Sequence, residues 1–236
     1  MNLLAIDTST DFCSVAASRG EALVFRHEPA GQRQAEMILD MVGAVLADAG
    51  LDLARIDGIA FGAGPGSFTG LRIAAGVTQG LALARGVGVV GVCSLLALAE
   101  EAAEQAAEVA SDDAADAQII SCLDARMGEV YHAAYRRAGA RWEEVSAPGL
   151  YKPEVVPVMP GGGWTGCGDG FAAYREGLAA RLAGCVSEIR AGSAPTARAV
   201  LKLAMPRFAA GESVDAAAAL PVYLRDKVAL KTSERK

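Results

Sequence analysis

The sequence predicts an α/β protein in which one pattern of strands and helices occurs twice, the second time in a reduced form. Two observations lead to this fold class. Apolar runs of strand length alternate with longer runs of helical periodicity, and the order of elements seen before Ser94 starts again near Ile119. Of the 236 residues, 52% are hydrophobic and 21% are charged, so the chain can build a packed core.

The first half contains three short strands, a helix, a strand, a second helix and a further strand. These elements are predicted at residues 3–6, 14–17, 22–25, 32–49, 56–62, 68–85 and 87–92. Arg19-Gly20-Glu21 joins the second and third strands as a hairpin, and Gly50 ends the first helix. This order is that of the ribonuclease-H-like unit on which actin-like domains are built.

The second half is shorter and less regular. A helix is predicted to begin at Ser94 and to give way to a solvated break at 111–113. Strands at 119–123 and 129–135, an irregular proline- and glycine-rich region at 146–170, and helices at 172–183 and 196–210 follow. We therefore predict a duplicated actin-like fold, with a first subdomain of residues 1–102 and 207–236 and a reduced second subdomain of residues 103–206.

The composition argues against several classes of function. The net charge is −6, from 22 basic and 28 acidic residues, so this chain alone is not expected to bind a phosphate backbone tightly. The five cysteines are scattered and neither of the two histidines lies near one, so we expect reduced thiols and no metal site. No apolar run reaches about 18 residues and the start of the chain has the pattern of a strand, so we expect a cytoplasmic protein with no membrane span and no signal peptide.

Two predicted strands end in an aspartate, as the phosphate-binding strands of actin-like ATPases and sugar kinases do. Asp7, Thr8 and Ser9 follow the first strand, where they could hold the water of a metal ion or simply cap a turn. Asp124 ends the strand that restarts the pattern, and the side chain of Arg126 stands where paired glycines would leave room for a phosphate. We interpret these residues as a degenerate nucleotide cleft in which Asp124 pairs with Arg126, and we assign no catalytic residue.

Two glycine-rich segments precede predicted helices. Residues 62–70 offer Ser67 as the N-cap of the next helix, and the free N–H groups there either receive an anion or only close the turn. Residues 161–170 could cradle a phosphate or form a flexible linker. No Walker lysine accompanies them, which excludes a P-loop.

The helix predicted over 68–85 is apolar almost all round. Gly76, Gly80 and Ala84 form a smooth stripe at i, i+4 and i+8, and few polar side chains interrupt the rest. A sheet covers one face, so the other face requires the 32–49 helix and a partner, unless the helix is simply central in its own domain. The residues predicted to form a partner interface are Ile38, Met41, Val45, Leu71, Arg72, Gly76, Val77, Gly80 and Leu81.

Four segments in the same order resemble the TsaB (YeaZ) family over nearly the full chain. They are residues 5–10 (AIDTST), 64–72 (GPGSFTGLR), 124–131 (DARMGEVY) and 220–226 (LPVYLRD). The resemblance implies a bacterial, non-catalytic protein of two actin-like subdomains. It also implies pairing, through the two helices of the first subdomain, with TsaD, the catalytic subunit that transfers a threonylcarbamoyl group to an adenosine beside the tRNA anticodon.

The resemblance implies further partners and excludes one older label. TsaE, a small ATPase, joins the pair, TsaC supplies the threonylcarbamoyl-adenylate donor, and isolated members pair with themselves as homodimers through the same helices. tRNA is reached only indirectly, and ATP or ADP is expected only within the complex, with no cofactor in the isolated chain. The label metalloprotease requires paired histidines, and the helix at 32–49 contains none, so peptide hydrolysis is not expected.

The sequence therefore favours a scaffold subunit needed for threonylcarbamoyladenosine formation in tRNA. Two other classes stay open: a small ATPase or small-molecule kinase that uses Asp7 and Asp124, and a free RNA-binding module. Binding and turnover of ATP by the isolated chain would favour the first class. Retention of tRNA at physiological salt would favour the second.

Overall fold

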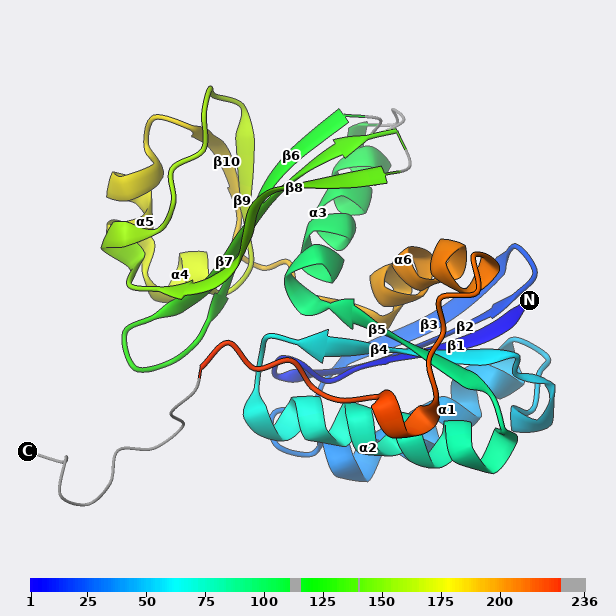
Figure 1. The fold of residues 1–236 in the computed structure, drawn as a ribbon. Helices are drawn as coiled ribbons and strands as arrows, with labels where there is room; N and C mark the ends of the chain where they lie inside the picture. The colour runs from blue at the N-terminus through cyan, green and yellow to red at the C-terminus, as the bar shows by residue number, and fades with distance from the viewer. Residues whose placement is uncertain (111–115, 140, 226–236) are drawn as a thin grey trace, which may run out of the picture.

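The computed structural model describes residues 1–110, 116–139 and 141–225, which form two lobes, each built on a five-stranded sheet (Figure 1). The first sheet has the order β3-β2-β1-β4-β5 and the second the order β10-β9-β6-β7-β8. The strands are β1 (Asn2–Asp7), β2 (Phe12–Arg19), β3 (Ala22–Pro29), β4 (Gly58–Gly64), β5 (Gly88–Cys93), β6 (Asp116–Asp124), β7 (Val130–Ala138), β8 (Arg141–Tyr151), β9 (Trp164–Cys167) and β10 (Val186–Arg190).

Both sheets repeat one topology. In chain order, each places its third, second, first, fourth and fifth strand side by side, and the first three strands pair antiparallel while the last two add in parallel. The predicted duplicated actin-like fold is therefore confirmed.

Two helices cover one face of the first sheet. α1 (Gln34–Asp48) and α2 (Phe68–Arg85) lie side by side on this face, and α6 (Ala197–Ala209) covers the opposite face (Figure 1). Ile38 and Val45 of α1 pack with Phe61 of β4 in the core between the two helices and the sheet. The 3-10 turn η1 (Leu53–Arg55) links α1 to β4. The prediction of a helix over 68–85 is confirmed, because Ser67 caps its start and Gly86, with φ of 64°, ends it.

The reduction of the second lobe affects its helices and leaves its strands complete. α3 (Ser94–Ala110) covers one face of the second sheet, and the other face carries η2 (Pro153–Val155), α4 (Gly170–Ala173) and α5 (Arg175–Leu182). Where the first lobe has helices of 15 and 18 residues, the second has a 3-10 turn of 3 residues and helices of 4 and 8. The side chain of Trp164 lies fully buried in the core beneath them.

Two helices exchange places between the lobes. α3 follows β5 of the first sheet but packs against β6 and β7, while α6 follows β10 of the second sheet but packs against β1, β2 and β4. Arg198 of α6 and the buried Glu101 of α3 form an ion pair at 2.5 Å where the two helices meet. The predicted return to the first subdomain at residue 207 is therefore too late, because α6 already buries Val200 and Leu201 against the first sheet.

The sequence did not predict β8, β9 or β10: β8 begins before the region predicted as irregular (146–170) and ends in it, β9 lies inside it and β10 lies beyond it. The break predicted at 111–113 lies outside the described residues. All five cysteines are free, and four of them are buried. Among the described residues, no helix has both the length and the apolar character that crossing a membrane requires.

Candidate functional site

The aspartates that end β1 and β6 lie at the cleft between the two lobes. A cavity of about 350 Å³ opens there, lined by Ser9 after β1, by Ser67 and Phe68 at the start of α2, and by Asp124 and Arg126 after β6. The structure thus brings Ser9 and Asp124 to one site. Asp7 and Thr8 do not line this cavity among its described wall residues, because both side chains are buried behind it.

The Asp7 carboxylate is buried and forms hydrogen bonds within its own turn. Only 1% of its surface is exposed, and its Oδ1 accepts hydrogen bonds from the Ser9 N–H at 3.0 Å and the Ser9 hydroxyl at 2.8 Å. Its Oδ2 has no hydrogen-bond partner in the described part of the chain and faces Gly62, where an added Cβ would lie 1.8 Å away. Burial raises the pKa of Asp7 from 3.8 to about 6. The carboxylate is therefore closed to a metal ion entering from the cavity.

The turn after β1 packs directly on the turn before α2. The Thr8 hydroxyl donates to the Gly70 carbonyl at 2.7 Å, and the Ser67 N–H donates to the Ser9 carbonyl at 2.7 Å. An added Cβ would lie 1.8 Å from the Thr8 carbonyl oxygen at Gly70, and 2.3 Å from the Ser9 carbonyl oxygen at Gly66. These glycines are required by contact between two segments of the same chain. Of the two alternatives left open for residues 62–70, the structure supports the closed turn.

The turn after β6 is closed by a pair that the sequence predicted. Arg126 Nη1 lies 3.1 Å from Asp124 Oδ2, and the Arg126 N–H donates to Asp124 Oδ1 at 2.7 Å. The Tyr174 hydroxyl donates to the same oxygen at 2.9 Å. Arg126 and Met127 both adopt left-handed backbone conformations, with φ of 60° and 57°. The predicted pairing of Asp124 with Arg126 is confirmed, and it occupies both carboxylate oxygens.

Among its described lining residues, the cleft lacks the unpaired cations with which phosphate loops hold a nucleoside triphosphate. Its two turns are also bonded to each other, since the Ser67 N–H donates to the Ser9 carbonyl. Among the described residues that line the cavity, Arg126 is paired with Asp124 and Arg225 with Glu129. Asp11 and Asp169 add negative charge to the same wall. No group of three histidines, cysteines or acidic residues able to hold a metal ion occurs in the part of the chain that the structure describes.

The glycines of 161–170 that lie in and after β9 serve packing as well. An added Cβ at Gly166 would meet the ring of Phe171 at 2.4 Å, and one at Gly168 would meet the Cys122 carbonyl oxygen at 2.2 Å. They allow β9 and the start of α4 to lie close to β6, and Phe171 fills the core of the lobe. Gly166 and Gly168 are therefore explained by packing in the second lobe's core, whereas Gly161, Gly162 and Gly163 are exposed.

The second candidate site is the outer surface of α1 and α2, where the structure divides the predicted interface residues. Ile38, Met41, Val45 and Leu71 are buried inside their own lobe, so their prediction as contact residues is wrong. Helical periodicity had marked the side of each helix that faces the sheet. The remaining predicted residues are exposed or half-buried: Arg72, Gly76, Val77, Gly80 and Leu81.

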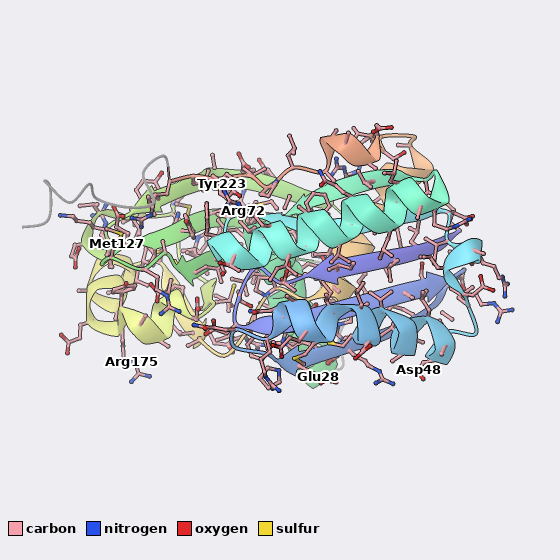
Figure 2. The ribbon with its side chains drawn as sticks, turned by 90° about the horizontal axis from the view of Figure 1, so that it is seen from below. Glu28, Asp48, Arg72, Met127, Arg175 and Tyr223 are labelled. Atoms are coloured by element: carbon pink, nitrogen blue, oxygen red, sulfur yellow. The ribbon has the colours of Figure 1, made fainter. Side chains whose placement is uncertain are left out.

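The outer surface of the two helices also contains residues that the sequence analysis missed. Leu39 is 58% exposed and Leu83 is 78% exposed, although neither is polar. We call the helical face the set of exposed and half-buried residues Ala35, Leu39, Gly43, Ala47, Arg72, Ile73, Gly76, Val77, Gly80, Leu81, Leu83 and Ala84. Ile73, Val77 and Leu81 of this set also pack against the lobe's own core. Figure 2, drawn from below, shows α1 and α2 side by side toward the viewer, with Arg72 near one end of α2. The missed signal was the spacing of Leu39, Gly43 and Ala47, which repeats every four residues.

Packing within the described residues does not explain three glycines of the helical face. No atom of the described residues lies within 4 Å of a Cβ built at Gly43, Gly76 or Gly80. Each lies within a helix with ordinary helical backbone, where glycine costs about 1 kcal/mol relative to alanine. Unlike Gly62, Gly66 and Gly70, these residues are not explained by contacts in their own lobe.

Comparison with known proteins agrees with the fold and the turns. A family model described as TsaD, tRNA N6-adenosine threonylcarbamoyltransferase, matches residues 28–232. The "tRNA threonylcarbamoyladenosine biosynthesis protein TsaB" of Escherichia coli is 35% identical over 98% of this chain and 97% of its own length, and the Haemophilus influenzae protein of the same name is 35% identical over 98% and 96%. The solved structure described as "YeaZ from Pseudomonas aeruginosa" is 36% identical, with a TM-score of 0.83, and the match covers 94% of this chain and 99% of that one. A second solved structure from Pseudomonas aeruginosa is described as having "similarity to peptidase YEAZ"; it has the same identity of 36% and TM-score of 0.83, with 95% and 99% covered.

The protein is of the actin-like class. Its two sheets have the same topology, exchanged helices join its lobes, and a cleft lies between them. Similarity over nearly the whole chain then narrows the class. The chain belongs to the TsaB (YeaZ) family, within the wider TsaD family. Its TsaB relatives from Escherichia coli and Haemophilus influenzae are named as tRNA threonylcarbamoyladenosine biosynthesis proteins.

Proposed function

We propose that this chain is a non-catalytic scaffold subunit that pairs with a TsaD chain through the helical face during the formation of threonylcarbamoyladenosine in tRNA. One observation carries the proposal. Leu39 and Leu83 are exposed beside three helical glycines that nothing in the described chain covers. Exposed apolar surface of this kind on two neighbouring helices is typical of a binding surface.

The relation between the two proteins supports pairing by equivalent surfaces. The match to the TsaD family model includes both α1 and α2. A TsaD chain is therefore expected to carry an equivalent pair of helices, and two related chains can pair about a pseudo-twofold axis. A homodimer of this chain would use the same face, so the two associations should exclude each other.

Small residues allow a partner helix to come close. Gly76 and Gly80 lie one turn apart on α2, and Gly43 lies on α1, so backbone is accessible where a partner helix would cross. Packed helices lie about 8–10 Å apart, and the distance depends on the side chains at the contact. Glu36, Asp40 and Arg72 are charged and exposed on the same helices, and they would set the orientation of the partner.

The cleft supports a role without catalysis by this chain. Its carboxylates at Asp7 and Asp124 are already bonded to their own turns, so neither is placed to act on a substrate. The net charge of −6 favours a complex in which the partner chain holds most of the tRNA. TsaE would then join the assembled pair, and any nucleotide would be bound in that assembly.

The proposal is tested by a substitution that adds bulk to the helical face alone. Gly80→Leu places a side chain where the folded chain has open space, so the isolated variant should keep the thermal stability of the wild type. Overpacking of a close helix contact costs about 1–3 kcal/mol, so affinity for TsaD in isothermal titration should fall about 5- to 150-fold. Ala179→Leu, at an exposed position of α5 in the other lobe, is the matched control and should bind normally.

Undiminished binding of the Gly80→Leu variant to TsaD would contradict the proposal. The rival ATPase or kinase is tested with the same preparation by titrating magnesium–ATP into the isolated chain. Micromolar binding together with turnover that is lost in Asp7→Ala would replace the scaffold with an enzyme.

A further inference from the structure

The last described segment of the chain runs past α2 of the first lobe toward the second lobe (Figure 1), and its Tyr223 and Arg225 line the cavity between the lobes. It leaves the 3-10 turn η3 (Ala216–Ala218), which packs against α2, and it is held there by the side chain of Gln79, which donates to the Ala219 carbonyl at 3.1 Å. The Val222 N–H then donates to the Ala63 carbonyl at 2.7 Å. Gly64, with φ of 115°, makes room, since an added Cβ would lie 2.5 Å from the Val222 carbonyl oxygen.

The next residue fastens the segment to the start of α2. The ring of Tyr223 lies 5.5 Å from that of Phe68, and the Arg72 Nε–H donates to the Tyr223 hydroxyl at 3.0 Å. The Arg72 guanidinium also lies 3.6 Å from the centre of the Phe68 ring. Figure 2 shows Arg72 and Tyr223 next to each other at this end of α2. These contacts tie the segment to the first lobe, because cations and aromatic rings attract at such distances.

The two residues that follow belong to the second lobe. Leu224 packs against the core between α3 and the second sheet. Arg225, whose side chain is only 14% exposed, lies 2.8 Å from the carboxylate of Glu129. Its guanidinium also donates to the carbonyls of Ala125 at 3.0 Å and Arg126 at 3.3 Å. The Arg225 Nη1–H also donates to the Met127 sulfur at 3.2 Å, so one planar group with several fixed donors reaches four acceptors of a single turn.

That turn is closed by two backbone hydrogen bonds, from the Ala125 N–H to the Glu129 carbonyl at 3.0 Å and from the Glu129 N–H to the Arg126 carbonyl at 3.1 Å, and Arg225 adds bonds from outside it. Arg126 and Met127 are consecutive residues with positive φ, a conformation that side chains bearing a Cβ disfavour. The carbonyls of Ala125 and Arg126, which accept from Arg225, flank the first of these residues. The Arg126 N–H also donates to Asp124 Oδ1 at the start of the turn, and Arg225 is the side chain from outside the turn that bonds to both of these carbonyls.

We infer that residues 219–225 form an interlobe strap and that Arg225 is the positioning residue that locks it, by holding the 125–129 turn in its left-handed conformation. The strap acts on the cleft side, while the Arg198–Glu101 ion pair joins α3 and α6 elsewhere between the lobes. With both in place, the lobes keep a fixed relative orientation. This inference does not depend on the identity of the partner chain.

The test is hydrogen exchange by mass spectrometry on full-length Arg225→Gln and Arg225→Lys variants. Loss of the guanidinium should speed exchange in peptides covering residues 122–131 at least about 10-fold, which corresponds to the loss of one charge-assisted hydrogen bond or more. Peptides from α1 and α2 should be unchanged. Lysine retains the charge but not the fork of donors, so Arg225→Lys should resemble Arg225→Gln and not the wild type.

Arg207→Gln is the matched control. Arg207 donates to the Gly91 carbonyl at 2.7 Å and lies 3.2 Å from the Glu212 carboxylate, so it makes the same kinds of bond within one lobe. It should leave exchange at 122–131 unchanged. Cleavage by trypsin after Arg126, whose side chain is 74% exposed, should accelerate in both Arg225 variants and not in Arg207→Gln. Unchanged exchange at 122–131 in Arg225→Gln, or an equal rise throughout the chain, would overturn the inference.

Discussion

Replacing Gly43, Gly76 and Gly80 together by alanine should have opposite effects on the folded chain and on its complex. In the isolated chain, each added methyl group enters open space on a regular helix. Alanine is better than glycine in a helix by about 0.8–1 kcal/mol, so the triple variant should gain roughly 2–3 kcal/mol. For a chain of this size that gain corresponds to a rise in Tm of roughly 5–10 °C.

Association should respond in the other direction. If a TsaD helix crosses the helical face at these glycines, three methyl groups displace it. The cost is expected to be at least about 2 kcal/mol, or roughly 30-fold in Kd. The assays are thermal unfolding followed by circular dichroism and isothermal titration with TsaD. Unfolding is measured at several protein concentrations, because self-association through the same face would make Tm depend on concentration.

Two results would refute this reasoning. A loss of stability in the isolated triple variant would show that the glycines serve the lobe itself. A gain in stability with unchanged affinity would show that the glycines do not lie where a partner approaches. Ala179→Gly on α5 calibrates the helix contribution, and it should lower stability by about 1 kcal/mol without affecting TsaD binding.

Two further predictions concern buried titratable groups, and urea unfolding at several pH values tests both. Burial raises the pKa of Asp7 to about 6, so the contribution of its protonated form to stability is present below pH 3.8 and is lost as the pH rises through 6. The free energy of unfolding of Asp7→Asn should therefore rise relative to that of the wild type by up to about 3 kcal/mol between pH 4 and 8. A difference that stays constant with pH would contradict this. Burial lowers the pKa of His132 from 6.5 to about 4, and its ring nitrogens have no partner among the described residues. The contribution of neutral His132 to stability is present above pH 6.5 and is lost as the pH falls through 4. Between these pH values, the free energy of unfolding of His132→Phe should therefore fall by up to about 3 kcal/mol less than that of the wild type. Parallel pH profiles of the variant and the wild type would contradict this.

The elements that the sequence predicted best are those whose ends are determined locally. α2 matches its predicted range because Ser67 and Gly86 are a helix N-cap and a left-handed C-cap, which are local features. β8 and β10 were missed because prolines and glycines in or near them obscure their pattern, although each pairs with the strand just before it in the chain. The boundary at 207 was wrong because the position of α6 depends on the first sheet, far away in the sequence.

The candidate site shows the same division. The pairing of Asp124 with Arg126 was predictable because the two residues share one turn. The helical face was predicted only in part, since apolar periodicity marks the side that is buried, and Leu71 proved to lie there. Only the positions of neighbouring atoms distinguish Gly80, which is open, from Gly70, which touches Thr8.

By itself, the sequence determined the duplicated α/β order, the caps of α2 and the absence of glycines where a phosphate would lie beside Asp124, because these depend on residues close together in the chain. The tertiary structure alone decided which half of each helix is free, which glycines are required internally and how residues 219–225 join the two lobes. These properties depend on burial, and burial is set by segments that come together only when the whole chain has folded.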